Sequence, residues 1–247
     1  HTNNFYYLLL YMKIAVLIAG YIRTFDRTYL NLLEFIKLND NHEFDFYFLI
    51  LIDKNEVGKR KDINLLNEKI KIINNIPNLR LLIKSEKGDQ WGNIFKLFCE
   101  FNKFKDDNKL DYDLMIKSRF DNNVNRYKIK NKSFYEKNVI VPKYYFYGMS
   151  SNLKCRKSIS NTYWKINPKS AVENYQNNYI INDRFAIGIC KDMYIYFETG
   201  KFFKEIMVKM RNVNKQCSTE GILAYHLKNN NVNYKHDSDL ITTIIRK

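Results

Sequence analysis

The sequence predicts an α/β fold in which a mostly parallel central sheet is flanked by helices, with a more irregular C-terminal half. Short apolar runs alternate with segments of helical periodicity through residue 121. These runs are nearly continuous, as expected of parallel strands that are covered on both faces. Of the 247 residues, 45% are hydrophobic and 15% aromatic, so the chain can bury a core and is not a disordered protein.

The first half of the chain contains four predicted strands and three predicted helices. The strands are expected at residues 14–19, 44–52, 79–83 and 112–117, and the helices at residues 30–38, 63–73 and 91–104. Parallel strands need a crossover connection, and a helix between each pair of strands supplies one. This order predicts a sheet of the Rossmann-like type.

The second half is less regular. We expect strands at residues 139–142, 181–189 and 232–234, and helices at residues 192–210 and 218–228. Gly200 is expected to break the first of these helices, because glycine is a poor helix former. Residues 143–168 are basic, aromatic and aperiodic. No internal repeat or convincing linker divides the chain, so residues 12–247 are interpreted as one domain.

The N-terminal residues 1–11 are interpreted as an upstream extension or a cloning remnant, with Met12 as a possible natural start. The apolar runs at 5–10 and 14–19 are separated by Lys13, and each is too short to cross a hydrocarbon core of about 30 Å. No signal peptide and no transmembrane segment are therefore predicted.

The net charge requires an explanation. Lys and Arg number 41 against 26 Asp and Glu, a formal charge of +15. Nucleic acid, an anionic membrane surface or phosphorylated small molecules would each suit such a chain. The composition, rich in Asn, Lys, Ile and Tyr, is also typical of a low-GC genome, which accounts for part of the charge without any function.

The four cysteines are widely spaced and form no CxxC pair; they are Cys99, Cys155, Cys190 and Cys217. Neither a zinc site nor a disulfide framework is indicated. Scattered cysteines in apolar surroundings are typical of a reducing compartment, so we expect a cytoplasmic location.

Ligands of open α/β sheets bind beyond the carboxyl ends of the strands. Residues 20–23, Asp53 and residues 118–121 follow predicted strands and are the first candidates. Gly20 permits close backbone approach, and Arg23 can pair with a phosphate. There is no GxGxxG or P-loop motif, and an ordinary strand-to-helix turn with a surface arginine is the alternative.

The exit of the strand at 112–117 is the most informative stretch. Arg119 and Asp121 are two residues apart, so in an extended chain they point to the same side. A carboxylate beside a cation suits a hydrated Mg²⁺ or Mn²⁺ ion and the diphosphate that it bridges. The alternative is a surface ion pair that contributes about 0 to 1 kcal/mol.

Four segments in order resemble small GT-A fold glycosyltransferases of the kind found in bacterial polysaccharide loci and large DNA viruses. They are residues 13–25, 112–121, 182–188 and 219–227. The resemblance implies a nucleoside diphosphate sugar donor, with a UDP-sugar expected, that binds near Ala19 and Gly20. Residues 13–121 would bind the donor and residues 122–247 a glycan acceptor, whose hydroxyl receives the sugar. A viral protein would act in the host cytoplasm.

The resemblance also implies a Mn²⁺ or Mg²⁺ ion at an Asp-x-Asp motif. Here that motif reads Arg119-Phe120-Asp121, so only Asp121 carries over as a ligand. This departure puts metal dependence in question, because Arg119 can itself neutralise part of the diphosphate charge. His236 is a further candidate ligand, since some members of the family use a C-terminal histidine; an ordinary exposed histidine is the alternative.

Two carboxylates are candidate catalytic residues. Asp183 precedes an apolar run and can deprotonate an acceptor hydroxyl, although an Asn-Asp pair also commonly forms a turn. Glu220 resembles the acidic residue that faces the acceptor in GT-A enzymes. Its position at a helix start is also stabilising without any function.

Other functions remain open from the sequence. Residues 143–169 interleave cations with aromatic rings, which fits an acceptor loop, single-stranded nucleic acid or a solvated loop. A nucleic-acid-binding module without catalysis is therefore the alternative function, although no recognised binding motif is present. A nucleotidyltransferase would need two adjacent carboxylates, and Asp111 and Asp113 lie at the wrong end of their strand.

Overall fold

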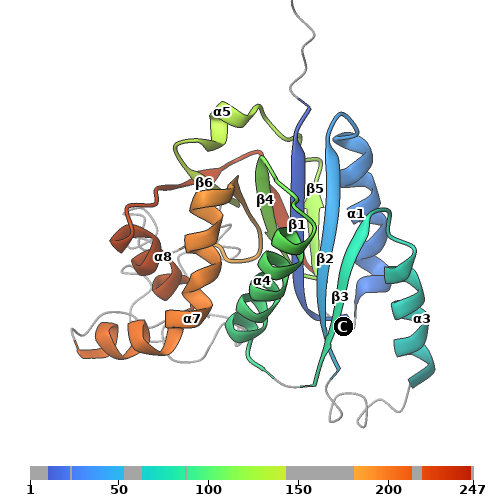
Figure 1. Ribbon diagram of the computed structural model, residues 1–247, viewed down its shortest axis with the longest axis horizontal. Helices are drawn as coiled ribbons and strands as arrows, with labels where there is room; N and C mark the ends of the chain where they lie inside the picture. The colour runs from blue at the N-terminus through green and yellow to red at the C-terminus, as the bar shows by residue number, and fades with distance from the viewer. Residues whose placement is uncertain are drawn as a thin grey trace, which may run out of the picture.

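The computed structural model describes residues 11–22, 24–52, 63–86, 88–142, 181–212 and 219–245. Within these ranges the chain forms a seven-stranded sheet and a separate two-stranded sheet (Figure 1). In spatial order, the large sheet consists of β3 (Leu79–Ser85), β2 (Glu43–Leu51), β1 (Lys13–Tyr21), β4 (Leu114–Ser118), β7 (Ala186–Ile189), β6 (Val139–Pro142) and β8 (Tyr234–Asp237). The small sheet pairs β5 (Asn122–Asn125) with β9 (Ile241–Ile244).

The large sheet is mostly parallel, as the sequence predicts. The pairs β1–β2, β1–β4, β2–β3 and β6–β8 are parallel. Only β7 runs against the others in this sheet, because it is antiparallel to both β4 and β6. Its amino end therefore lies at the edge where the carboxyl ends of β4 and β6 lie.

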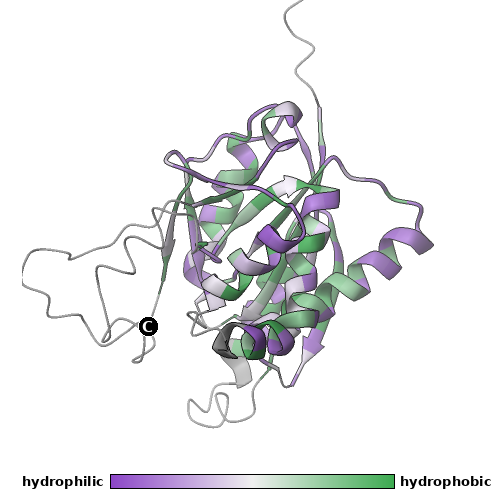
Figure 2. Ribbon diagram, turned by 90° about the vertical axis from the view of Figure 1, so that its left-hand side faces the viewer, coloured by the Kyte–Doolittle hydropathy of each residue, from purple (hydrophilic) through white to green (hydrophobic). Residues whose placement is uncertain are grey.

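Helices cover both faces of the sheet. They are α1 (Phe25–Leu38), α3 (Ile63–Asn74), α4 (Gln90–Asp107), α7 (Cys190–Asn212) and α8 (Thr219–Asn229), and a short helix α5 (Lys132–Tyr135) lies between β5 and β6 along the chain. One core cluster joins the sheet to α1 and α3, and the other joins it to α4, α7 and α8. In Figure 2 the helices carry both purple and green residues, as expected of helices with one buried side.

Alternate residues of β1 belong to the two clusters. Ile14, Val16 and Ile18 pack in the cluster with α1, whereas Ala15 and Leu17 pack in the cluster with α4. Both sets are buried, which explains why β1 is a continuous apolar run in the sequence and not an alternating one.

Strand β7 is shorter than the predicted strand at 181–189. Residues before Ala186 form a turn, in which the Arg184 backbone N–H donates to Asn182 Oδ1 at 3.2 Å. The side chain of Asn182 thus takes the hydrogen bond that a neighbouring strand would otherwise accept. The prediction was wrong over residues 181–185 for this reason.

The helical conformation of α7 continues through Gly200, so the helix does not end there as predicted, although its axis turns sharply between its two halves (Figure 1). A Cβ atom at Gly200 would overlap the Trp91 carbonyl oxygen and lie 2.6 Å from Phe95 Cβ. Glycine is therefore needed for the close approach of α7 to α4.

The small sheet was not predicted, since residues 122–125 lack an apolar pattern. Its strand β5 is held by the Asn31 side chain of α1, which accepts from Val124 N at 2.6 Å and donates to Val124 O at 3.2 Å. Val124 is 7% exposed and supplies the only apolar side chain of β5. None of the helices in the described ranges has the length and hydropathy to span a membrane.

Candidate functional site

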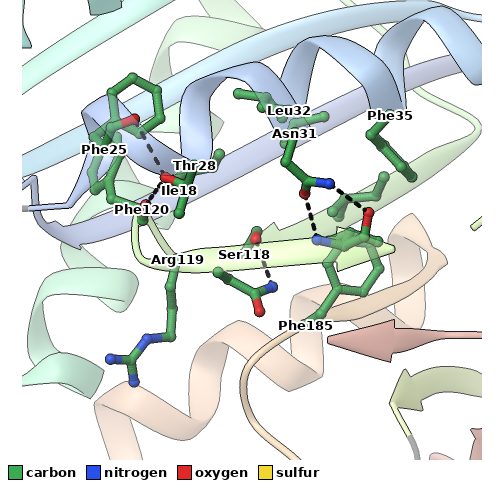
Figure 3. Close-up of a pocket in the computed structure, with 14 residues that line it drawn as sticks. Ile18, Phe25, Thr28, Asn31, Leu32, Phe35, Ser118, Arg119, Phe120 and Phe185 are labelled. Carbon is green, nitrogen blue, oxygen red and sulfur yellow. Dashed lines mark hydrogen bonds between the residues drawn. The ribbon is translucent and has the colours of Figure 1, made fainter. Parts of the chain in front are cut away.

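The loop after β4 carries the central residues of the site and is firmly anchored. Thr28 Oγ1 donates to the Phe120 carbonyl oxygen at 2.5 Å. The Phe120 ring packs edge-on against Phe25 and Phe48, with ring centres 5.2 and 5.3 Å apart. Figure 3 shows Phe120 beside Thr28 and Phe25, while Arg119 points away from them. Burial of Phe120 therefore fixes its two neighbours on the opposite side of the loop.

Arg119 and Asp121 form a two-pronged ion pair, as their spacing predicts. Arg119 Nε donates to Asp121 Oδ1 at 2.8 Å, and Arg119 Nη2 donates to Asp121 Oδ2 at 2.9 Å. The two side chains are 28% and 11% exposed. Burial disfavours the Arg119 charge, but the hydrogen bonds and charge of Asp121 outweigh it and raise the Arg119 pKa. This pair is more shielded than the exposed pair that was the alternative.

Gln90 connects this ion pair to Asp183. Gln90 is the first residue of α4, directly after Asp89, whose carboxylate accepts from Gly92 N at 2.7 Å and caps the helix. Arg119 Nη1 donates to Gln90 Oε1 at 3.1 Å, and Gln90 Nε2 donates to Asp183 Oδ2 at 2.7 Å. A continuous hydrogen-bonded chain therefore runs from Asp121 to Asp183.

Asp183 reaches this edge because β7 is reversed. It lies in the turn just before β7, and the amino end of β7 is adjacent to the carboxyl end of β4. Its side chain is largely buried. The turn that was the alternative interpretation is present, and it is also the feature that presents the carboxylate to Gln90.

Lys117 is a buried cation behind this chain of contacts. It is 1% exposed, its Nζ donates to the Asp183 carbonyl oxygen and it lies 5.9 Å from the centre of the Trp91 ring. Burial lowers the pKa of Lys117 to about 8, although the charges of Asp183, Asp121 and Glu220 favour the protonated form. Lysine is rarely buried without a functional or structural partner.

Two further donors lie close to Lys117 and Asp183. Trp91 Nε1 and the Tyr196 hydroxyl are buried and have no hydrogen-bond partner among the described residues. The two rings are 5.9 Å apart. Burial raises the pKa of Tyr196, and the negative charge of Asp183 raises it further, so the hydroxyl stays protonated as a donor.

Glu220 lies in the first turn of α8 and completes the group of charges. Its charge acts on both Lys117 and Arg119. The Ile181 N–H donates to the Glu220 carbonyl oxygen at 3.5 Å, which connects the start of α8 to the segment before Asp183. The structure thus brings Glu220, Asp183, Arg119 and Asp121 into one region.

The remaining donor-site candidates are only partly described. Ala19 is buried at the end of β1, on the face covered by α4. Gly20 has a φ of +141°, a backbone conformation that favours glycine, and a Cβ there would have no atom within 4 Å. Arg23 and Asp53 lie outside the described residues.

His236 lies on β8, away from Asp121. Its Nδ1 is 3.2 Å from the Pro142 carbonyl oxygen. Strand β8 is three positions from β4 in the sheet, which corresponds to roughly 14 Å at the usual strand spacing. His236 as a metal ligand stays a prediction.

The described residues do not form a ready metal site. They contain no group of three or more His, Cys, Asp or Glu side chains that could hold a metal ion. Both oxygens of Asp121 accept hydrogen bonds from Arg119, so Asp121 would have to release Arg119 to bind an ion in the same way. The Mn²⁺ or Mg²⁺ cofactor also stays a prediction, and these contacts do not fit it.

A small cavity lies beneath the loop, between α1 and the sheet. It measures about 20 Å³, and its lining includes Phe25, Phe35 and Phe185 (Figure 3). This is room for about one water molecule, far below the several hundred Å³ of a usual ligand pocket. The cavity is a gap in the core packing and is too small for a ligand.

The sequence analysis did not select Gln90, Lys117, Trp91 or Tyr196. Lys117 left a signal, because a lysine interrupts the apolar run of a strand that is buried on both faces. The sequence signal for Gln90 was weak, since nothing in the pattern distinguishes a residue that follows a helix-capping aspartate. Trp91 and Tyr196 resemble ordinary core residues of their helices.

Comparisons with known proteins identify no family. No protein-family model matches the chain, and no curated protein matches it. Among solved structures, the chain is similar to the nucleoside-diphosphate-sugar pyrophosphorylase from Vibrio cholerae RC9, with 8% identity and a TM-score of 0.40. That likeness covers 91% of this chain and 92% of the other. A likeness of this size carries no information about activity.

Proposed function

We propose that this protein is a glycosyltransferase that moves a hexose or deoxyhexose from a nucleoside diphosphate sugar, with UDP-sugars the expected class, to a glycan hydroxyl. The observation that carries the proposal is the convergence of Arg119, Asp121, Asp183 and Glu220 at the carboxyl edge of a mostly parallel sheet. This is the edge at which open α/β sheets bind ligands. The resemblance of four sequence segments to GT-A enzymes supports the same function.

On the donor side, Arg119 is the group suited to the diphosphate. Its guanidinium stays charged and is held in a fixed orientation by Asp121. Planar guanidinium groups bind phosphate oxygens through two parallel hydrogen bonds. Such a contact would strengthen as the leaving diphosphate gains negative charge, which is what transition-state stabilisation requires.

On the acceptor side, Asp183 or Glu220 would take the proton. In an inverting reaction the acceptor oxygen attacks the anomeric carbon, the bond from that carbon to the phosphate oxygen breaks, and the carboxylate receives the hydroxyl proton. Asp183 has one oxygen held by Gln90 at 2.7 Å, which orients the carboxylate. Both the inverting and the retaining outcome are compatible with two carboxylates near one cation.

The test is donor turnover. The purified chain is incubated with a panel of UDP-, GDP-, CDP- and dTDP-sugars, and release of the nucleoside diphosphate is measured with and without Mn²⁺. Asp183→Asn and Glu220→Gln are compared with Asp107→Asn, an exposed residue at the end of α4. We expect one donor to be consumed and at least one of the two site variants to be slowed by about a hundredfold or more. Absence of turnover with every donor would overturn the proposal.

Nucleic-acid binding receives no support from a described contact. Residues 143–169, which suggested it, lie outside the described residues.

A further inference from the structure

At the position where the resemblance to GT-A enzymes implies a divalent ion, the structure has a guanidinium and its counterion. Both oxygens of Asp121 accept hydrogen bonds from Arg119, at 2.8 and 2.9 Å. The Asp121 residue as a whole, backbone included, is 8% exposed, so solvent does not compete strongly for this ion pair. A carboxylate engaged in this way serves as an anchor for the arginine. Each oxygen keeps a second lone pair, but a metal ion bound there would lie beside the fixed positive charge of Arg119, which disfavours it.

The anchored guanidinium still has donors to offer. An arginine carries five N–H groups. Three of those on Arg119 are used, two by Asp121 and one by Gln90. The other two, on Nη1 and Nη2, have no partner among the described residues. Each of the two terminal nitrogens therefore keeps one donor for a ligand, and guanidinium donors of this kind bind phosphate oxygens.

A second cation lies behind the first. The charges of Lys117 and Arg119 act on each other, and both also act with Asp121, Asp183 and Glu220. Two cations and three carboxylates give a local formal charge of one negative unit, so the region as a whole does not repel a metal ion. What disfavours a metal at Asp121 is the engagement of its oxygens by Arg119.

We propose that Arg119, held by Asp121 and with Lys117 buried next to it, contacts the diphosphate of the donor in place of a divalent metal ion. This inference rests on the proposed function, because it concerns the same donor. It assigns Asp121 as a positioning residue for Arg119 and Arg119 as the group that contacts the phosphates. It therefore reverses the role that the family resemblance gives to Asp121.

The test is nucleotide binding measured by calorimetry, which does not depend on knowing the acceptor. UDP, GDP, CDP and dTDP are titrated into the protein in EDTA and, separately, in Mn²⁺. We expect at least one of them to bind with a Kd that differs by less than about threefold between the two conditions, because the protein supplies the cation. Binding that is more than about tenfold tighter in Mn²⁺ would overturn this inference and leave the proposed function intact.

Two variants separate the roles of the two residues. Arg119→Asp creates the Asp-x-Asp pattern of the family, and it is expected to lose binding in EDTA by about tenfold or more and to regain binding only in Mn²⁺. Asp121→Asn keeps the shape of the side chain but releases Arg119, and it is expected to weaken binding in EDTA. Lys96→Asp, which makes the same charge change at an exposed position of α4, is expected to bind as the unmodified chain does.

The outcomes are distinguishable. If Arg119→Asp binds in EDTA as tightly as the unmodified chain, or if Asp121→Asn weakens binding only in Mn²⁺, the inference is wrong. If no nucleoside diphosphate binds under either condition, the proposed function itself is wrong. Circular dichroism of each variant establishes that it is folded, and Asp121→Asn provides a near-isosteric alternative if Arg119→Asp does not fold.

Discussion

Gln90 Nε2 donates to Asp183 Oδ2 at 2.7 Å, so the first residue of α4 holds the turn that precedes β7. The other end of the same amide accepts from Arg119. One neutral side chain therefore keeps a carboxylate and a guanidinium in a fixed relation without a direct ion pair between them.

Replacing Gln90 with Ala should weaken this arrangement. A hydrogen bond to a charged group contributes about 1.5 to 3 kcal/mol, so we expect the free energy of unfolding to fall by about that amount or somewhat less, since Gln90 itself is exposed. Urea denaturation measures the change. The exposed Lys103→Ala on the same helix is the control and should change stability by less than about 0.5 kcal/mol. Equal stabilities for the two variants would contradict the prediction.

Thr28→Val should loosen the loop that carries Arg119. It removes the hydrogen bond to the Phe120 carbonyl oxygen and leaves that buried acceptor without its donor, which destabilises the fold by about 1 to 3 kcal/mol. We also expect weaker nucleotide binding, because a shift of Phe120 would also displace its neighbour Arg119. Thermal unfolding and calorimetry measure the two effects. Thr28→Ser retains the hydroxyl and should bind nucleotide nearly normally; failure of this rescue would show that the hydroxyl is not responsible.

Lys117 should make stability depend on pH in the alkaline range. Burial lowers its pKa from 10.5 to about 8 in the folded chain. Below the folded pKa, both states hold the proton and the folded state bears the unfavourable burial of a charge. Between the two pKa values the unfolded chain binds more protons, so stability rises with pH by up to about 1.4 kcal/mol per unit.

A Lys117→Met variant isolates this contribution, because tyrosine ionisation also affects unfolding at high pH. The stability of the unmodified chain minus that of the variant should increase between about pH 7 and about pH 9.5. Urea unfolding at several pH values provides the comparison, and the exposed Lys96→Met serves as the control. Parallel curves for the unmodified chain and Lys117→Met would rule out a lowered pKa.

Gly200→Ala should be destabilising, by up to about 2 kcal/mol net. The added methyl group would overlap the Trp91 carbonyl oxygen, and backbone atoms of a packed helix cannot yield easily. Overpacking of this kind usually destabilises by about 1 to 3 kcal/mol and here has to offset the better helix propensity of alanine, about 1 kcal/mol. Gly92→Ala on α4 meets only the surface side chain of Asp89, at 3.3 Å, and is the matched comparison in thermal unfolding. A stabilised Gly200→Ala variant would show that α7 and α4 are less closely packed.

The strands of the first half were predictable because burial on both faces leaves continuous apolar runs. Strand β2 is Glu43–Leu51, and all of it beyond Glu43 is buried, which matches the run seen in the sequence. Strand β5 was not predictable, since it is fixed by the side chain of Asn31 and not by its own hydrophobicity.

The site was partly predictable for a related reason. Arg119 and Asp121 follow a predicted strand two residues apart, so local geometry brings them together. Gln90 belongs to the site because it contacts Asp183, which is distant in the chain. Lys117 belongs to it because its side chain is buried although it lies on a strand of apolar residues. Neither follows from local spacing. The role of Gly200 was misjudged because close helix packing and helix termination both favour glycine.

The reversed direction of β7 has a consequence for the order in which the protein is made. Strands β1 to β4 and their helices come from the N-terminal half and can pair while the chain is still being synthesised. Asp183 joins them only after β7 has been inserted beside β4, with its chain direction opposite to all earlier strands of the sheet. The candidate site would then be among the last parts to be completed, because a chain that ends before β7 carries Arg119 and Asp121 but lacks Asp183.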